Sequence, residues 1–257
     1  MWSIVRRVSQ TELVGRAING MAETCAHLAN RVMYKPHVAW WNNREWLSPY
    51  EKYVDGNRIL DRRFTAAKWA EASRRLNGST AECGVYTGVT SAIICKTLEG
   101  YLGDNEFHYG FDSFEGLSQP VAVDAHLTDE DVTSYALKLT LKRQWRKGDL
   151  TCGIEVAAEK VKDFSFCRLV KGSIPECFSV IRNERFRFVH IDVDLFQPTW
   201  HSLVFFYPRL VSGGIVVFDD YGMLTCPGAR AATDQFFKDK PENCVELSTG
   251  QAVMIKD

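Results

Sequence analysis

The sequence predicts an α/β fold, a Rossmann-like domain built on a mostly parallel sheet, with additional helices before it. From about residue 80, short runs of β-branched and aromatic residues alternate with segments of helical periodicity. Several of these runs end in a glycine turn or in acidic residues, and open parallel sheets bind their ligands at the carboxyl ends of the strands. The chain closes with a hairpin pattern, which predicts two antiparallel strands at one edge of the sheet.

Composition excludes several classes of partner. The chain has 257 residues, 46% of them hydrophobic, which is ordinary for a domain with one large core. Thirty-one basic and 32 acidic residues give a net charge of −1 with no basic stripe, so nucleic acid is not an expected partner. The sequence shows neither an export signal nor about 18 consecutive apolar residues. We therefore expect a soluble cytoplasmic protein with no membrane contact.

The cysteines indicate a reducing compartment. All eight are scattered along the chain, several inside apolar runs, and no CxxC pair occurs. This pattern favours reduced, buried thiols over a disulfide framework or a zinc site.

Residues 1–78 are predicted to form a helical extension packed on the main domain, which spans residues 79–257. Apolar residues recur at helical spacing between Thr11 and Met33, which is compatible with intrachain packing, with a lid or with a homo-oligomer contact. Trp40, Trp41 and Trp46 follow, as a packing cluster or as a wall of a substrate pocket. A helix is expected over residues 61–76, closed by a glycine signal at residue 78.

The first strand runs into a glycine turn and a helix, over residues 80–100. Only Gly84 and Gly88 are glycines here, so the turn is not a GxGxxG fingerprint. Glu82 precedes them, and its charge disfavours a pyrophosphate but suits a ligand that carries an ammonium and a sulfonium. The turn therefore favours S-adenosylmethionine over a dinucleotide, although glycine turns after strands also occur for geometric reasons alone.

Two further strands end in polar residues that could complete a cofactor site. The strand over residues 107–112 ends at Asp112, which is placed to accept hydrogen bonds from ribose hydroxyls or to cap a turn. The strand over residues 166–170 leads into Gly172 and Ser173, which we expect beside an adenine.

Paired carboxylates follow the next two strands. Asp192 and Asp194 end the run that begins at Val189, and Asp219 and Asp220 end the run that begins at Val216. Four carboxylates at one sheet edge repel each other unless a cation lies among them, and oxygen ligands favour Mg²⁺. Any single one of these residues could instead cap a helix or form a turn.

The remaining pattern predicts an insertion and the other helices. Residues 115–151 are too long for a plain loop and predict a lid with helical pieces. Helices are expected near residues 154–161, 175–181, 198–210 and 227–237, and hairpin strands near 244–247 and 252–256.

Taken in order, these motifs resemble the macrocin O-methyltransferase family. The resemblance covers about residues 81–237 and rests on five motifs: Glu82-Cys83-Gly84-Val85-Tyr86 with Gly88; Gly110-Phe111-Asp112-Ser113-Phe114-Glu115-Gly116-Leu117; His190-Ile191-Asp192-Val193-Asp194-Leu195; Pro208-Arg209-Leu210 with Gly213-Gly214; and Asp219-Asp220-Tyr221-Gly222 with Pro227-Gly228-Ala229-Arg230. Phe196 departs from the tyrosine that members commonly carry, so any role of that hydroxyl is absent here.

The resemblance implies a class I methyltransferase fold and a Mg²⁺-dependent enzyme that moves a methyl group from S-adenosylmethionine to a sugar hydroxyl of a glycosylated natural product. By analogy Asp192, Asp219 and Asp220 would hold Mg²⁺, and Asp194 would be the general base. His190 is expected in the core or behind the ligands. The residues expected at the cofactor are Glu82, Gly84, Val85, Tyr86, Thr90, Ser91, Asp112, Ser113, Gly172 and Ser173.

Three alternatives stay open at this point. A catechol-type acceptor is the nearest, because a metal with acidic ligands suits a diol of either kind. Asp192-Val193-Asp194 also matches the DxD pattern of metal-dependent glycosyltransferases, although the glycine turn and the second acid pair have no place there. A non-catalytic relative that kept the fold is the third.

Overall fold

The computed structural model describes residues 48–54, 60–125 and 144–257. The chain divides into two compact units, residues 1–52 and residues 53–257. Of the first unit only a short 3-10 helix, η2 (Ser48–Tyr50), and the two residues after it are described. The helix expected between Thr11 and Met33 and the cluster of Trp40, Trp41 and Trp46 lie outside the described residues.

The second unit is built on a seven-stranded sheet with the order β3-β2-β1-β4-β5-β7-β6. The first five strands are parallel, while β7 is antiparallel to both β5 and β6, as the hairpin pattern predicts. The mostly parallel α/β fold is therefore confirmed. The strands are β1 (Ser79–Cys83), β2 (His108–Asp112), β3 (Cys167–Lys171), β4 (Phe186–Ile191), β5 (Leu210–Phe218), β6 (Val245–Glu246) and β7 (Ala252–Ile255).

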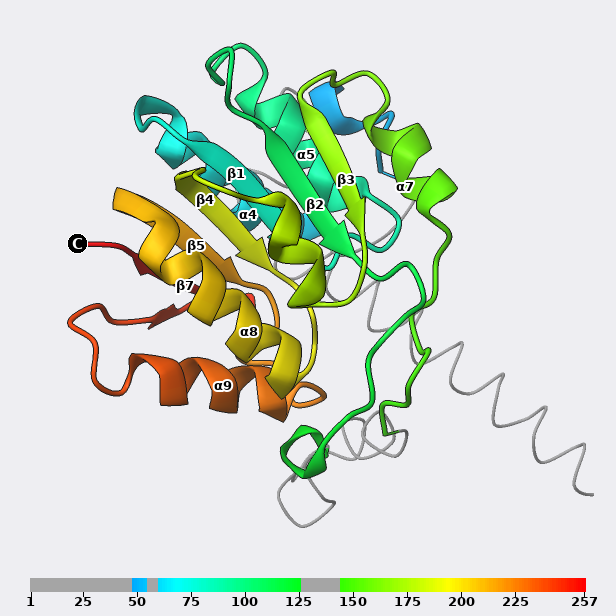
Figure 1. Ribbon diagram of the computed structural model, residues 1–257, viewed down its shortest axis with the longest axis vertical. Coiled ribbons are helices and arrows are strands. Elements are labelled where there is room, and N and C mark those ends of the chain that lie inside the picture. The colour runs from blue at the N-terminus through cyan, green and yellow to red at the C-terminus, as the bar shows by residue number, and fades with distance from the viewer. Residues whose placement is uncertain (1–47, 55–59, 126–143) are drawn as a thin grey trace, which may run out of the picture. The chain divides into compact units, whose positions relative to one another are not determined.

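Helices cover both faces of this sheet. In Figure 1, α4 and α5 lie behind the sheet and α8 lies in front of it, with α9 packed beside α8. The α-helices are α4 (Leu60–Ala72), α5 (Val89–Leu98), α7 (Ile154–Val161), α8 (Phe196–Phe206) and α9 (Pro227–Phe237). Short 3-10 helices are η3 (Ser73–Arg75), η4 (Ala122–Asp124), η5 (Glu176–Val180) and η6 (Tyr207–Arg209).

Most expected elements lie within a few residues of their predicted positions. One element differs in type, and another differs in where it begins. The segment after Pro175 is the 3-10 helix η5 and not an α-helix. Strand β5 begins at Leu210 and runs through the glycine pair instead of starting after it, with an irregular register opposite Phe186 and Phe188. The compact unit begins at Tyr53 and includes α4, and a domain boundary at residue 78 stays a prediction.

Strand alternation gives the two faces of the sheet different chemistry. On β1 and β2, Ala81, Cys83 and Phe111 contribute to a large apolar cluster with the phenylalanines of α8 and α9. The alternate positions carry polar side chains, and Thr80, Glu82 and His108 are all fully buried. Since successive side chains point to opposite faces, α5 covers a buried polar stripe that must be satisfied by hydrogen bonds.

The described part of the chain contains no helix long and apolar enough to cross a bilayer. Of the predicted lid, residues 115–125 and 144–151 are described, and they include η4. The 3-10 turn is held by Asp124, whose carboxylate accepts hydrogen bonds from the backbone N–H groups of Val121 (2.8 Å) and Phe196 (2.7 Å). The lid base is thereby fastened to the start of α8.

Candidate functional site

A cavity of about 540 Å³ opens at the carboxyl ends of the parallel strands. It lies where the strand order reverses between β1 and β4, the place at which open α/β sheets bind their ligands. Six of the ten residues expected at the cofactor line it: Gly84, Tyr86, Thr90, Asp112, Ser113 and Ser173. The four strand-end acids line it as well: Asp192, Asp194, Asp219 and Asp220.

Gly84 lets the loop after β1 pass directly against the end of β4. Its φ is +86°, and a Cβ atom there would lie 1.7 Å from the carbonyl oxygen of Asp192. Any side chain would therefore displace the backbone that carries the first acid. The glycine is required by close packing of two strand ends, and the same packing leaves the loop facing the cavity.

Asp112 has one of the two roles that the sequence left open, because it caps the turn. Its carboxylate caps the glycine turn, accepting hydrogen bonds from the backbone N–H groups of Val85 and Tyr86 at 2.8 Å each and of Phe114 at 2.6 Å. It also lines the cavity. The acid at the end of β2 thus fixes the turn after β1, and a contact with ribose hydroxyls stays a prediction.

Four of the expected cofactor residues do not line the cavity. Glu82 of β1 and Ser91 of α5 are fully buried between the strand and the helix, where the Ser91 hydroxyl donates to the Glu82 carboxylate. Strand alternation turns Glu82 away from the loop that follows it. Val85 packs in an apolar cluster with Phe114, and Gly172 is absent from the cavity lining, although its neighbour Ser173 belongs to it.

Three of the four strand-end acids lie around one arginine of α4. Nη2 of Arg62 lies 3.1 Å from Oδ1 of Asp220 and 3.8 Å from Oδ1 of Asp192. It also forms a close ion pair with Oδ2 of Asp219. The sequence analysis missed this residue. The available signal was that several acids at one edge need a positive charge, and a pair of arginines opens the predicted helix.

Burial perturbs these acids strongly. Burial and the nearby charge of Asp192 together raise the pKa of Asp220 to about 6, although Arg62 opposes the shift. The pKa of Asp194 is raised well above its usual value by burial and by the charges of Asp220 and Asp192. Raised carboxylate pKa values around a cavity mark a candidate functional site.

Asp194 is held in an unusual backbone conformation. Its φ is +60°, a region that non-glycine residues seldom adopt and that clusters at functional sites. Its backbone N–H donates to Oδ2 of Asp220 at 2.9 Å, and the thiol of Cys226 donates to its Oδ1 at 3.3 Å. The hydrogen bonds with Asp220 and Cys226 thereby hold Asp194 in place at the cavity that it lines.

His190 connects the buried polar stripe to the acids. Its Nδ1 lies 3.0 Å from Oε1 of Glu82, and its Nε2 lies 3.1 Å from Oδ1 of Asp219. Burial lowers the pKa of His190, but the hydrogen bond and charge of Glu82 outweigh burial and leave it raised. Gln251 also donates to Oδ1 of Asp219, at 2.6 Å. His190 is buried, as expected, and fixes Asp219 from behind.

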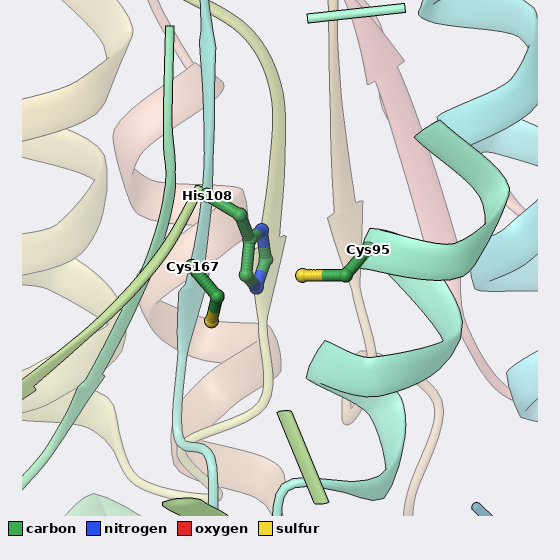
Figure 2. Close-up of side chains that lie close together, drawn as sticks. All are labelled: Cys95, His108 and Cys167. Carbon is green, nitrogen blue, oxygen red and sulfur yellow. The ribbon is translucent and has the colours of Figure 1, made fainter. Parts of the chain in front are cut away.

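A second group of metal-ligand types lies elsewhere under the sheet. Cys95 of α5, His108 of β2 and Cys167 of β3 place one ligand atom each within 4.8 Å of one another, as Figure 2 shows. His108 and Cys167 are register partners on neighbouring strands, so their side chains share a face. The sequence analysis expected scattered thiols and did not predict this cluster, because the cluster depends on strand register and not on a local motif.

Structural comparison defines the class of fold. The calicheamicin methyltransferase CalS11 matches with a TM-score of 0.60 and 19% identity, covering 91% of each chain. The O-methyltransferase NovP matches with a TM-score of 0.55 and 21% identity, covering 76% of this chain and 79% of NovP. The fold is that of class I S-adenosylmethionine-dependent O-methyltransferases, as predicted.

Sequence comparison then identifies the family. The profile of the TylF macrocin-O-methyltransferase family matches residues 53–243, and the chain belongs to that family. Demethyldecarbamoylnovobiocin O-methyltransferase of Streptomyces niveus is 24% identical over 163 residues, 62% of this chain and 58% of that enzyme. A tetracenomycin-C rhamnosyl 4'-O-methyltransferase of Streptomyces olivaceus is 24% identical over 156 residues, 59% of this chain and 56% of that enzyme. The match spans less than two thirds of either relative.

Proposed function

We propose that this protein is a Mg²⁺-dependent O-methyltransferase that moves the methyl group of S-adenosylmethionine to a hydroxyl, on a sugar of a glycosylated natural product. The observation that carries the proposal is the convergence of Asp192, Asp219 and Asp220 beside a cavity at the switch point of a methyltransferase fold. Membership of the macrocin-O-methyltransferase family supports the reaction class.

The cavity supports S-adenosylmethionine as the methyl donor. The glycine turn, Asp112 and Ser173 border it from three neighbouring strands, which is the arrangement a nucleoside needs. Two solved methyltransferases of the same fold, PaMTH1 of Podospora anserina and an O-methyltransferase of Bacillus cereus, are bound to SAH, with TM-scores of 0.51 and 0.50. We expect Asp112 at the ribose and Ser173 near the adenine.

The donor set supports Mg²⁺. One cationic atom, Nη2 of Arg62, lies within ion-pair distance of all three expected ligands, so their carboxylates reach a common point. All three offer hard oxygen ligands, which Mg²⁺ prefers. Bound there, Mg²⁺ would lower the pKa of a coordinated hydroxyl and hold it in line with the sulfonium methyl.

Asp194 is the proposed general base. Its raised pKa makes its carboxylate a stronger base than an ordinary aspartate. It takes the proton of the acceptor hydroxyl as the oxygen attacks the methyl carbon, and the sulfonium leaves as the neutral thioether. The hydrogen bonds from Cys226 and to Asp220 hold its carboxylate and backbone for that transfer.

A sugar hydroxyl is the favoured acceptor. The name of the Streptomyces olivaceus relative specifies methylation of a rhamnosyl group, and CalS11 is described as a TDP-rhamnose 3'-O-methyltransferase. The acceptor would enter the cavity beside residues 115–119, which line it. The seven described cysteines form no disulfide, which supports the proposed cytoplasmic location.

Calorimetric titration tests the proposal in stages. S-adenosylmethionine and S-adenosylhomocysteine are titrated into the protein, each with Mg²⁺ and with chelator, followed by methyl transfer to a panel of glycosides and catechols. We expect micromolar binding of both cofactor forms and Mg²⁺-dependent methylation of a glycoside. Transfer to catechols alone would favour the phenol alternative. Binding of a nucleotide-sugar without either cofactor form would replace the methyltransferase assignment.

A further inference from the structure

We propose that Arg62 is a built-in counter-ion of the acidic site, which offsets part of the negative charge of the three ligand carboxylates in the metal-free protein and must leave when Mg²⁺ binds. The inference rests on the proposed Mg²⁺ dependence and adds a competition between the metal and a residue of this chain. Arg62 belongs to α4, outside every motif by which the sequence resembles its family.

Arg62 makes several contacts within the acid site. Its Nη2 atom forms ion pairs with Asp192, Asp219 and Asp220, and it also donates to the backbone carbonyl of Asp219 at 3.1 Å. Gln251 fastens this arrangement from the other side, because its Nε2 lies 3.1 Å from the carbonyl oxygen of Arg62 and 2.6 Å from Oδ1 of Asp219. Helix α4 is therefore joined to the end of β5 through the acids.

Electrostatics explains why the cation is needed. Asp219 and Asp220 are 6% and 4% exposed, and Asp194 and Asp192 face them across the strand ends. Buried like charges raise each other's free energy, so a metal-free site that kept all four acids ionised would push the strand ends apart. The guanidinium supplies one positive charge and several donors in a geometry that matches carboxylates.

The same geometry excludes simultaneous occupancy. Mg²⁺ requires its oxygen ligands at about 2.0–2.1 Å in near-octahedral geometry. A metal that contacts the three carboxylates would occupy the point where Nη2 now lies and would repel the guanidinium at contact distance. Arg62 and its neighbour Arg63 border the cavity, so the side chain has a solvent-accessible direction in which to move. Mg²⁺ affinity thus includes the cost of displacing Arg62.

The test measures Mg²⁺ binding by calorimetry, with S-adenosylmethionine affinity measured in parallel. Arg62→Gln removes the charge and keeps a polar side chain, and we expect it to bind Mg²⁺ at least about tenfold more tightly than the unaltered protein. Arg62→Lys keeps the charge and should stay within about threefold of the unaltered protein. Lys68→Gln is the matched control, because it removes one positive charge from the exposed face of the same helix, where Lys68 pairs with Glu71.

A second measurement uses the unaltered protein and does not depend on the stability of a variant. With ¹⁵N-labelled arginine, the side-chain Nε–H resonance of Arg62 is assigned as the one missing from Arg62→Lys. Addition of Mg²⁺ should shift this resonance and speed its exchange with water.

The outcomes separate the two proposals. Unchanged Mg²⁺ affinity in Arg62→Gln, or an unchanged Arg62 resonance while Mg²⁺ binds, would overturn the counter-ion assignment and leave the metal-dependent function standing. Absence of Mg²⁺ binding in every variant that still binds S-adenosylmethionine would overturn the metal dependence, and the counter-ion inference with it.

Discussion

Two clusters of metal-ligand side chains lie on the same sheet, one at its strand ends and one beneath α5, and their chemistry is opposite. At the carboxyl ends of β4 and β5, Asp194 and Asp220 have raised pKa values and stand at a cavity beside Arg62. Under α5, burial raises the pKa of the Cys95 thiol and lowers the pKa of His108 to about 3, so both groups are neutral at pH 7. The cluster at the strand ends brings acidic side chains and a cation together, whereas Cys95 and His108 of the cluster under α5 are uncharged.

The difference follows from solvent access and from hydrogen bonding. His108 is fully buried, with Nδ1 at 2.9 Å from the Thr80 hydroxyl and Nε2 at 3.3 Å from the Ser91 hydroxyl. Its polar atoms therefore have partners within the fold. The strand-end acids instead line a cavity that a ligand can enter, with the guanidinium of Arg62 beside them. A cluster of ligand-type residues is consequently a poor guide to function until its charge state and access are known.

A chain of hydrogen bonds joins the two clusters. His108 contacts Ser91, Ser91 donates to Glu82, Glu82 contacts His190, and His190 contacts Asp219. The polar stripe under α5 thus supports the acid site from behind. The following predictions test the contrast between the two clusters, beginning with the largest effect.

Asp194→Asn should abolish the function of the acid cluster without unfolding the protein. Loss of the general base is expected to lower kcat by about 10²- to 10⁴-fold. The affinity for S-adenosylmethionine should change less than about twofold, because the amide is nearly isosteric. Asp239→Asn, at an exposed site at the end of α9, is the control and should keep full turnover. Full activity of Asp194→Asn would remove this residue as the base.

Gly84→Ala should damage the acid cluster through packing. The added methyl group meets the Asp192 carbonyl, and the alanine must adopt a positive φ. We therefore expect a loss of more than about 2 kcal/mol in the free energy of unfolding. Gly100→Ala is the matched control, because Gly100 also has a positive φ but nothing lies within 4 Å of its added Cβ. Equal denaturant midpoints for the two variants would refute the close-packing argument.

Because of His108, the free energy of unfolding should fall as the pH is lowered. Its folded pKa of about 3 lies below the ordinary value of 6.5, so between these values the unfolded chain binds a proton that the folded protein does not. This group's contribution is intact above about pH 6.5 and falls by about 1.4 kcal/mol per pH unit below it. His108→Gln should flatten the pH dependence of unfolding by that slope between pH 4 and 6. Parallel curves for the two proteins would show that His108 is protonated in the fold.

The smallest expected effects come from replacing two cysteines, Cys226 beside the strand-end acids and Cys95 in the cluster under α5. Cys226→Ala removes a donor to Asp194, and a lost hydrogen bond of about 0.5–1.5 kcal/mol should lower kcat by about 2- to 10-fold. Cys95→Ala should lower only the free energy of unfolding, with kcat and Mg²⁺ affinity within about twofold of the unaltered protein. A larger loss of turnover in Cys95→Ala than in Cys226→Ala would mean that the cluster under α5 takes part in function.

The fold was predictable to a large extent because its signals are local. Apolar runs and helical periodicity place β1, β2, β4 and α9 close to their observed bounds. A buried strand or helix face requires apolar residues at fixed short spacings, which a short stretch of sequence shows directly. The acid pairs were predictable in the same way: each directly follows a strand, and parallel strands bring their carboxyl ends to one edge.

The identity of the contacts was decided by tertiary structure. Residue spacing could not show that Glu82 turns under α5 to hold Ser91 and His190, because that depends on which face of β1 is covered. It could not show that His108 meets Cys167, because the register of β2 and β3 brings them together. Arg62 lies 157 residues before Asp219 and contacts it only because α4 packs on the sheet at β4 and β5.

The sequence by itself therefore determined the class of fold, the family and the position of the acids, all of which depend on local pattern and order along the chain. Only the tertiary structure decided the charge state of each cluster and the cation that balances the acids. The physical reason is that pKa values and ion pairs depend on burial and on distances between side chains, which residues remote in sequence create together.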